Sequence, residues 1–394
     1  MNPRVLEDKL RALAAQFPVV TVTGPRQAGK TTLCRATFPH LAYVTLEAPD
    51  VRAYALRDPR GFLAELRGGA ILDEVQRAPD LLSYLQGEVD ERPEPGRFIL
   101  TGSANFALLQ TVSQSLAGRT ALLNLLPLEM AELRAFGPVP EDLFEVLWRG
   151  SYPAVFDRGL DARDWYRGYV GTYLERDVRQ ILNIGDLVAF QSFLRLAAGR
   201  TAQLLNLSGL GSDAGVTHGT ARSWVSVLEA SFVAHRLSPL HSNLSKRIVK
   251  TPKLHFFDTG LVCYLLGIRS PDDLRNHPLR GAIFETWVAA EVLKAHHHRG
   301  VEPALFFFRD RKGQEVDLVL DRSRDPVAVE AKSGQTVAED FFAGFDALDR
   351  LPPEGSSSRW RRVVVYGGRE RQERSRALVL PWSQIDRFDW PGAG

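Results

Sequence analysis

Short apolar runs alternate with polar, helix-like segments in the first part of the chain. The apolar runs predict buried strands at residues 18–23, 42–46, 69–74 and 97–100. Between them, a short helix is predicted at residues 31–38, and a helical, charged stretch runs up to about residue 66. Strands that alternate with helices form a mostly parallel sheet, which binds ligands at the carboxyl ends of its strands. The pattern therefore predicts an α/β domain over residues 1–140.

A different pattern marks the middle of the chain. Two short helices are predicted around a glycine turn, the second of them over residues 218–230. The elements that follow are strands at residues 232–237 and 253–257, with a polar loop at residues 242–250 between them. Two short helices around a turn indicate a helix-turn-helix, and the strands with their loop complete the outline of a winged helix. We therefore expect a middle domain, a helical linker with a winged helix, over residues 141–275.

The last block of the chain returns to a mixed α/β pattern. An amphipathic helix is predicted over residues 281–293. Strands are predicted at residues 305–308, 315–320 and 327–332. Together these elements predict a third domain, also of the α/β class, over residues 276–394.

Composition and charge narrow the class of protein without identifying a partner. A length of 394 residues suggests two or three domains, and 44% apolar with 24% charged residues is typical of soluble globular proteins. The net charge of +2 favours neither nucleic acid nor membrane, so any basic surface must be local. Two cysteines are too few for a disulfide framework, and no apolar run approaches the ~20 residues of a membrane span. We expect a cytoplasmic protein with no membrane segment.

The first predicted strand leads into a motif with the spacing Gly, four residues, Gly-Lys-Thr. This is the spacing of a phosphate-binding loop, whose glycines let backbone N–H groups point at phosphate oxygens, as does the N-terminal end of the next helix. Lys30 is placed to reach the β- and γ-phosphates, and the Thr31 hydroxyl to ligate Mg²⁺. ATP and Mg²⁺ are the expected cofactors, and the predicted nucleotide-binding residues of the loop are Gly24, Pro25, Arg26, Gln27, Ala28, Gly29, Lys30, Thr31 and Thr32.

Acidic and hydroxyl residues follow the later strands at positions that suit a nucleotidase. Asp73 would hold the Mg²⁺ shell, and Glu74 is placed to polarise the attacking water. Ser103 is placed to contact the γ-phosphate or the water, with a plain turn as the alternative. Arg119 would reach the γ-phosphate of a neighbouring subunit, unless it is an ordinary surface arginine. Lys30, Glu74 and Arg119 are thus the predicted catalytic residues, and Arg119 implies self-association as a dimer or ring.

Four motifs occur in an order that resembles a known family. They are Gly-Pro-Arg-Gln-x-Gly-Lys-Thr-Thr-Leu, Leu-Asp-Glu-Val-Gln, Leu-Thr-Gly-Ser and Leu-Ala-Gly-Arg. In this order they resemble the prokaryotic AAA+ ATPases of unassigned role that carry a C-terminal domain of unknown function. The resemblance covers essentially the whole chain. The family also shows the charge cluster Glu175-Arg176-Asp177, which we expect to form salt bridges, with nucleotide sensing by Arg176 as the alternative.

Basic residues in the predicted winged helix suggest contacts with DNA. The predicted phosphate-binding residues are Arg222 on the second helix and Lys246, Arg247, Lys250 and Lys253 on the wing. Basic residues outnumber acidic ones only modestly in this part of the chain. The alternative is a winged helix that serves packing or protein contacts only.

A second possible chemistry lies in the last block. Glu330 and Lys332 are two apart in a strand and face the same side, where Asp317 on a neighbouring strand can join them. Asp317 and Glu330 would bind a hard cation such as Mg²⁺, and Lys332 would orient a nucleophilic water. With Glu285 on the preceding helix, this set resembles the PD-(D/E)xK nuclease fold, to which the family's C-terminal domain is similar. The alternative is a Glu-Lys pair that merely crosses a sheet face.

Three adjacent histidines, His296, His297 and His298, close the helical part of the last block. A turn at residues 299–300 follows them directly. Histidines at such a helix end are usually solvated, so we expect solvent exposure here rather than metal binding.

These features together predict an AAA+ type ATPase with a winged-helix middle and a restriction-nuclease-like last domain, acting on DNA. In this hypothesis, hydrolysis moves the basic wing relative to the nuclease-like domain. Two alternatives stay open. One is a nucleotide-controlled switch that binds a protein partner and uses the last domain as an inert docking module. The other is a metal-dependent nuclease gated by ATP.

Overall fold

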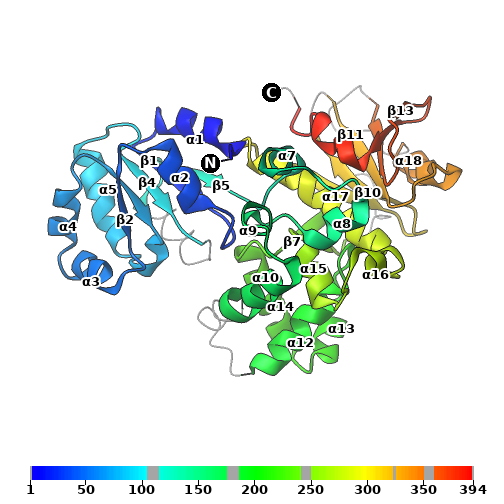
Figure 1. The fold of residues 1–394 in the computed structure, drawn as a ribbon, viewed down its shortest axis with the longest axis horizontal. Helices are drawn as coiled ribbons and strands as arrows, with labels where there is room; N and C mark the ends of the chain where they lie inside the picture. The colour runs from blue at the N-terminus through cyan, green and yellow to red at the C-terminus, as the bar shows by residue number, and fades with distance from the viewer. Residues whose placement is uncertain are drawn as a thin grey trace. The chain divides into compact units, whose positions relative to one another are not determined.

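The computed structural model describes residues 2–103, 115–174, 186–240, 250–322, 325–349 and 359–392. Contacts within the chain divide it into two compact units. The first unit comprises Met1–Pro127, Ala230–Phe232 and His297–Val301, and the second comprises Leu128–Glu229, Val233–His296 and Glu302–Gly394. Each unit has its own β-sheet (Figure 1).

The first unit contains a five-stranded sheet whose neighbouring strands all run parallel. The strands, coloured blue to cyan in Figure 1, are β1 (Val19–Thr23), β2 (Ala42–Thr45), β3 (Ala70–Asp73), β4 (Phe98–Thr101) and β5 (Thr120–Asn124). Their order across the sheet is β2-β3-β4-β1-β5. All five strands therefore end at one edge of the sheet, where the residues after β1, β3 and β4 meet. The α/β class and the parallel sheet predicted for this part are confirmed.

Helices cover both faces of this sheet. They are α1 (Leu6–Ala14), α2 (Lys30–Thr37), α3 (Pro49–Arg57), α4 (Pro59–Glu65) and α5 (Leu81–Glu91), with a 3₁₀ turn at Val75–Arg77. Side chains alternate between the two faces along a strand, so β1 contributes to two cores. Val20 and Val22 pack in one core with residues of α1 and α2, and Val19 packs in the other with residues of α4 and α5. A strand buried on both faces reads as a continuous apolar run, which is why β1 was visible in the sequence.

The second unit contains a nine-stranded mixed sheet. Its strands are β6 (Gln203–Leu204), β7 (Ala234–Pro239), β8 (Lys253–Phe256), β9 (Leu305–Arg309), β10 (Glu315–Leu320), β11 (Val327–Lys332), β12 (Arg361–Tyr366), β13 (Gln372–Glu373) and β14 (Leu378–Pro381). Their order is β13-β14-β12-β11-β10-β9-β7-β8-β6. The strands predicted at residues 315–320 and 327–332 have those bounds in the structure.

The second unit also contains helices. They are α7 (Met130–Phe136), α8 (Leu143–Arg149), α9 (Pro153–Asp157), α10 (Ala162–Tyr169), α12 (Leu187–Ala198), α13 (Leu207–Asp213), α14 (His218–Ala230), α15 (Thr259–Leu265), α16 (Pro271–Arg275), α17 (Arg280–His297) and α18 (Ala343–Leu348). A π-helical turn, Val170–Leu174, follows α10, and 3₁₀ turns lie at Glu339–Phe342 and Trp382–Arg387. Helix α17, predicted as amphipathic, is instead buried on nearly every side from Ile283 onward. None of the helices within the described residues has the length and apolar character that a membrane span requires.

The middle and last blocks of the chain share the nine-stranded sheet. Strand β8 pairs antiparallel with β6 on one side and with β7 on the other, and β7 pairs in parallel with β9. Helices α13 and α14 and strands β7 and β8 occur where the sequence predicted the helices and strands of a winged helix. The wing loop was predicted at residues 242–250, and residues 242–249 of it lie outside the described residues. The boundary predicted between residues 275 and 276 therefore runs through one compact unit, and the division into three domains stays a prediction.

Candidate functional site

The loop between β1 and α2 has the curled backbone that the Gly-Lys-Thr motif predicts. Strand β1 ends at Thr23, and α2 begins at Lys30. Gly29, which precedes the helix, has a φ of 95°, a left-handed conformation that costs glycine little. Gln27 also has a positive φ of 64°. The residues predicted from the motif span this loop and the first turn of α2, and Thr32 lies exposed on that turn.

Lys30 folds back beneath the loop. Its Nζ donates hydrogen bonds to the carbonyl oxygens of Gly24 at 3.0 Å and Pro25 at 2.8 Å. The residue is only 7% exposed. Burial lowers the pKa of Lys30 to about 8, although the carboxylates of Glu74 and Asp73 act in the opposite direction. The ammonium is thus placed for an anion that enters the loop, and it is only weakly compensated before one arrives.

The Asp73 carboxylate at the end of β3 is the centre of a hydrogen-bonded group. The Thr31 hydroxyl donates to Asp73 Oδ1 at 2.8 Å, and the Tyr43 hydroxyl donates to Oδ2 at 2.9 Å. Thr101, at the end of β4, also donates to Oδ1. Burial and the bond to Asp73 raise the pKa of Tyr43 to about 12, so its hydroxyl stays a donor. Thr31 and Asp73, the two predicted Mg²⁺ ligands of this unit, are in contact and supply the oxygen atoms that Mg²⁺ requires.

Glu74 follows Asp73 in a strained backbone conformation. Its φ of 57° is left-handed, which is uncommon for a residue other than glycine and is found at functional sites. The Gln76 amide donates to the Glu74 carboxylate and to the Ser103 hydroxyl, the latter at 2.9 Å. Ser103 and Glu74 are therefore linked through Gln76, at the edge of the sheet where β3 and β4 end.

Three residues that support this site were not predicted from the sequence. Arg4 is buried and donates to the carbonyl oxygens of Ala28 at 2.7 Å and Leu126 at 2.8 Å. Tyr43 and Gln76 bind Asp73 and Glu74 as described above. Tyr43 is the second residue of β2, the strand that pairs with β3, and this place on a neighbouring strand is a usable signal, because residues of paired strands lie close together. Arg4 and its two partners are 24 and 122 residues apart in the sequence, so no local pattern indicates these contacts.

Arg119 lies at the opposite edge of the same sheet. It precedes β5, whereas the nucleotide loop follows the carboxyl end of β1. Its guanidinium binds both carboxylate oxygens of Asp90, with Nε to Oδ1 at 2.5 Å and Nη2 to Oδ2 at 2.8 Å. This pairing lowers the pKa of Asp90 and raises that of Arg119. Arg119 is thus remote from the nucleotide loop of its own chain, and its action on a neighbouring subunit stays a prediction.

The predicted nuclease-like residues meet in the second unit. Lys332 Nζ lies 2.6 Å from Glu330 Oε2 and 3.9 Å from Asp317 Oδ2. Asp317 Oδ2 also accepts the backbone N–H of Ala331 at 2.8 Å. Burial, followed by the nearby Asp317, raises the pKa of Glu330 to about 9. Adjacent antiparallel strands, β10 and β11, therefore bring these three side chains to one face, as the spacing predicted.

Glu315 and Lys253 complete this acid cluster, and the position of Lys253 corrects a prediction. Glu285, Glu315 and Asp317 each place a carboxylate oxygen within 4.8 Å of the others, and among the described residues this is the group that could hold a metal ion. Lys253 binds Glu285 at 2.6 Å and also pairs with Glu315. The prediction that Lys253 contacts DNA is wrong, because its side chain is buried at 1% exposure in these ion pairs. Glu315 was detectable, since it lies two residues before Asp317 on the same strand face.

The other residues predicted to contact DNA fall into two groups. Arg222 on α14 and Lys250 are exposed, while Lys246 and Arg247 lie outside the described residues.

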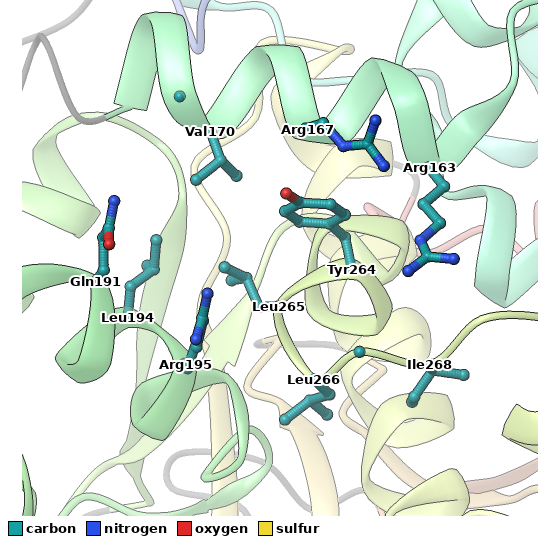
Figure 2. A pocket seen from close by; sticks show the side chains of 12 residues that line it. Arg163, Arg167, Val170, Gln191, Leu194, Arg195, Tyr264, Leu265, Leu266 and Ile268 are labelled. Carbon is teal, nitrogen blue, oxygen red and sulfur yellow. The ribbon is translucent and has the colours of Figure 1, made fainter. Parts of the chain in front are cut away.

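A separate pocket of about 690 Å³ lies between α10, α12 and α15. Figure 2 shows Arg163 and Arg167 from α10 on one side of Tyr264, and Arg195 from α12 on another. Its described lining contains no carboxylate, and its apolar floor includes Leu194, Leu265 and Ile268.

The expectation of solvated histidines is wrong, because His296 and His298 are buried. His296 Nδ1 lies 2.7 Å from the carbonyl oxygen of Val292 in the preceding helical turn. His298 Nε2 accepts the backbone N–H of Leu126 at 3.2 Å. These histidines therefore serve packing within their units. The charge cluster Glu175-Arg176-Asp177 lies outside the described residues.

Comparisons with known protein families match three successive parts of the chain. Family models match an AAA domain at residues 16–134 and two domains of unknown function at residues 140–272 and 280–385. A solved Walker-type ATPase of Pyrococcus abyssi is similar at 16% identity, over 66% of this chain and 94% of that one, with a TM-score of 0.46. Uncharacterized proteins of Mycobacterium tuberculosis and Mycobacterium bovis are each 34% identical over 385 residues, 96% of this chain and 83% of each relative. At this identity and coverage the chain belongs to the same family as the two mycobacterial proteins, and its first unit carries an AAA-type ATPase domain.

Proposed function

We propose that this chain hydrolyses ATP with Mg²⁺ in the loop between β1 and α2, and that hydrolysis drives an action on DNA. The observation that carries the first half is the 2.8 Å hydrogen bond between Thr31 and Asp73 beside the buried Lys30. These residues lie on different strand–helix units, and their types are those that hold Mg²⁺ and phosphate in nucleotidases. A chance glycine turn would have no reason to bring them together.

Each side chain of the site has a separate role in this proposal. Lys30 exchanges its bonds to the Gly24 and Pro25 carbonyls for bonds to phosphate oxygens. Thr31 and Asp73 hold Mg²⁺, which neutralises phosphate charge when it is bound. Glu74 accepts a hydrogen bond from the attacking water once its carboxylate is released by Gln76.

The link from Glu74 through Gln76 to Ser103 gives the site a way to respond to its nucleotide. Ser103 is placed to contact the γ-phosphate or the water, as the sequence predicted. The Ser103 hydroxyl accepts the 2.9 Å bond from Gln76 and keeps its own proton to donate to a phosphate oxygen or to the water. The Gln76 amide then connects such a contact to the Glu74 carboxylate, which couples occupancy of the site to activation of the water.

Exposed basic groups of the second unit support the second half of the proposal. Arg222 and Lys250 are free to meet phosphates on the surface of the predicted winged helix. The pocket lined by Arg163, Arg167 and Arg195 adds a second positively charged surface to the same unit. Arg167 pairs with Asp164 at 3.2 Å, while Arg163 and Arg195 line the same hollow. Guanidinium groups suit a phosphate-bearing chain, because arginine binds phosphate in a bidentate manner.

The test is ATP turnover by the full chain, with and without single-stranded, duplex and four-way-junction DNA, at low and at moderate salt. We expect one DNA form to stimulate turnover, and the stimulation to fall as salt rises, because phosphate contacts release counterions. Lys30→Ala and Glu74→Gln should each lower turnover by about 10²- to 10³-fold. Lys312→Ala, at an exposed lysine in the second unit, serves as the matched control and should turn over ATP like the wild type.

The two halves of the proposal fail separately. Unchanged hydrolysis in Lys30→Ala would show that the loop is not the ATPase site. Turnover that depends on Lys30 but is indifferent to every DNA would keep the ATPase and remove DNA. In that case a nucleotide-controlled switch with a protein partner becomes the better account.

A further inference from the structure

The acid cluster of the second unit has the carboxylates of a metal site, but a lysine lies among them. Lys253 Nζ is 2.6 Å from Glu285 Oε1 and pairs with Glu315 Oε1 as well. Mg²⁺ requires oxygen ligands at about 2.0–2.1 Å in near-octahedral geometry. An ion that bound Glu285 and Glu315 at that distance would overlap the ammonium group that now lies between them. The residues present therefore do not fit a bound divalent metal.

The position of Lys253 is fixed by its backbone. Lys253 pairs with Leu237 of β7 on one side and with Leu204 of β6 on the other. Its side chain is 1% exposed and lies 5.5 Å from the centre of the Phe307 ring. A lysine held in the middle of three strands and covered from solvent cannot swing out as a surface lysine does.

Three acidic side chains surround the Lys253 ammonium group. Burial alone would lower its pKa, but the carboxylates of Glu285, Asp317 and Glu315 together raise it above the usual range. His255, on the same strand, places Nε2 3.9 Å from Glu285 Oε1. Lys253 Nζ, at 2.6 Å, is the nearer partner of this oxygen, so the ammonium and not the imidazole pairs with Glu285.

The other half of the cluster is closed as well. Glu330 is 3% exposed and pairs with Lys332. The backbone of α18 approaches it so closely that a Cβ on Gly344 would lie 2.3 Å from Glu330 Oε1 and 1.9 Å from the Glu315 carbonyl oxygen. Arg309, at 3.0 Å from Glu315 Oε2, adds a third cation at the rim. A phosphodiester would have no open approach to Glu330 past this helix.

We propose that Lys253 is the resident cation of this cluster, and that the cluster joins β8, α17 and β10 into one core rather than cleaving nucleic acid with a divalent metal. This inference is independent of the ATPase proposal, since none of its residues lies in the nucleotide loop. The carboxylates lie where those of a nuclease would lie, but they bind a lysine instead of a divalent metal. The three acids are then satisfied by the protein itself in every nucleotide state.

The experiment follows Mn²⁺ binding by electron paramagnetic resonance, because free Mn²⁺ gives a signal that protein-bound ion loses. Every full-length chain carries Thr31→Ala and is kept free of nucleotide, to suppress binding at the loop. With Lys253 present, we expect no loss of signal at millimolar Mn²⁺ that depends on Asp317. Lys253→Met should bind Mn²⁺ and rise in melting temperature when it is added, and Lys253→Met with Asp317→Asn should do neither. Lys312→Met, at an exposed lysine, is the matched control.

The outcomes decide the inference in either direction. Mn²⁺ binding by the chain with Lys253, abolished by Asp317→Asn, would overturn it. So would cleavage of linear, nicked or branched DNA by wild-type protein that Asp317→Asn removes. A folded Lys253→Met chain that binds no Mn²⁺ would show that the lysine does not occupy a cation site. If Lys253→Met fails to fold while Lys312→Met folds normally, absence of Mn²⁺ binding in the chain with Lys253 still supports the inference.

Discussion

Lys30 is hydrogen-bonded by two backbone carbonyls, so its charge state depends on what enters the loop. A carboxylate partner would hold the ammonium charged at any ordinary pH, as at Lys253. Carbonyl oxygens compensate burial less well, and the pKa falls to about 8. Two buried lysines of one chain thus respond to pH in opposite ways. The difference lies entirely in their neighbours.

Nucleotide affinity should therefore depend on pH. Since the pKa of Lys30 is about 8 without nucleotide and rises beside phosphate, binding takes up a proton above pH 8. We expect a constant affinity below pH 8 and a loss that approaches tenfold per pH unit above it. Fluorescent-nucleotide titration over about pH 7 to 10 measures this. Lys30→Arg is the control, because a guanidinium stays protonated throughout.

The same lowered pKa affects stability with a defined sign. The folded chain releases the Lys30 proton near pH 8, whereas the unfolded chain holds it to about 10.5. Between these values the unfolded state binds more protons, so the contribution of Lys30 to folding stability rises with pH. A nucleotide affinity that stays flat up to pH 10 in the wild type would contradict both statements.

At the level of residues, the sequence predicts those whose chemistry is tied to a motif. Lys30, Thr31 and Asp73 carry fixed spacing or a fixed place after a strand, and the structure brings them together. Tyr43, Gln76 and Arg4 act through contacts that depend on neighbouring strands and on distant chain segments. Their residue types are common, and only the fold gives them a role.

Among the elements of the first unit, the start of α1 supports the nucleotide loop through Arg4, which lies two residues before the helix. Arg4 reaches the carbonyls of Ala28 and Leu126, which fixes the loop against the chain after β5. Arg4 is 6% exposed. Its removal would leave two carbonyl oxygens without these donors. A buried acceptor without a hydrogen bond lowers the free energy of unfolding.

Arg4→Ala should destabilise the first unit by about 1–3 kcal/mol and weaken nucleotide binding. Chemical denaturation of the full chain, followed with and without nucleotide, measures both effects. Arg57→Ala, at an exposed position on α3, should change neither. Equal stability of Arg4→Ala and Arg57→Ala would mean that Arg4 does not hold the loop.

The sequence is more informative about elements than about their assembly. Apolar runs located β1, β3, β4, β10 and β11 because buried strands have few polar positions. Strand β8 was predicted too, but Lys253 on it was expected to be exposed and to contact DNA. Burial of Lys253 depends on Glu285 and Glu315, which lie 32 or more residues away. A long-range ion pair of this kind leaves no periodic trace.

At the scale of the whole molecule, Arg119 links the site to assembly. Its bidentate bond to Asp90 holds it at the edge of the sheet away from its own loop. Action on a neighbour would require it to exchange Asp90 for phosphate. Both partners are on the surface, where such a pair contributes little and the exchange is inexpensive.

Mixing two inactive variants tests this arrangement. Arg119→Ala lacks the arginine but keeps Glu74, and Glu74→Gln has the reverse defect. If Arg119 acts between subunits, a mixture should recover a measurable part of wild-type turnover, since some interfaces combine an intact Glu74 with an intact Arg119. An equal mixture of Glu74→Gln with Lys30→Ala protein gives the background, because every nucleotide site in it lacks either Glu74 or Lys30. Absence of recovery in a mixture shown to co-assemble would count against action in trans.

Cutting the chain at the boundary predicted between residues 275 and 276 would strip β9 of its partner β7. In the intact second unit the outermost strands, β6 and β13, are two residues long, and such short edges offer little backbone for another molecule to extend. The truncated piece would expose the apolar run Leu305-Phe306-Phe307-Phe308 as a new edge, which is a template for aggregation. A soluble fragment for expression or crystallisation should therefore begin near residue 128 and keep β7 with β9, whatever the domain boundaries in the sequence suggest.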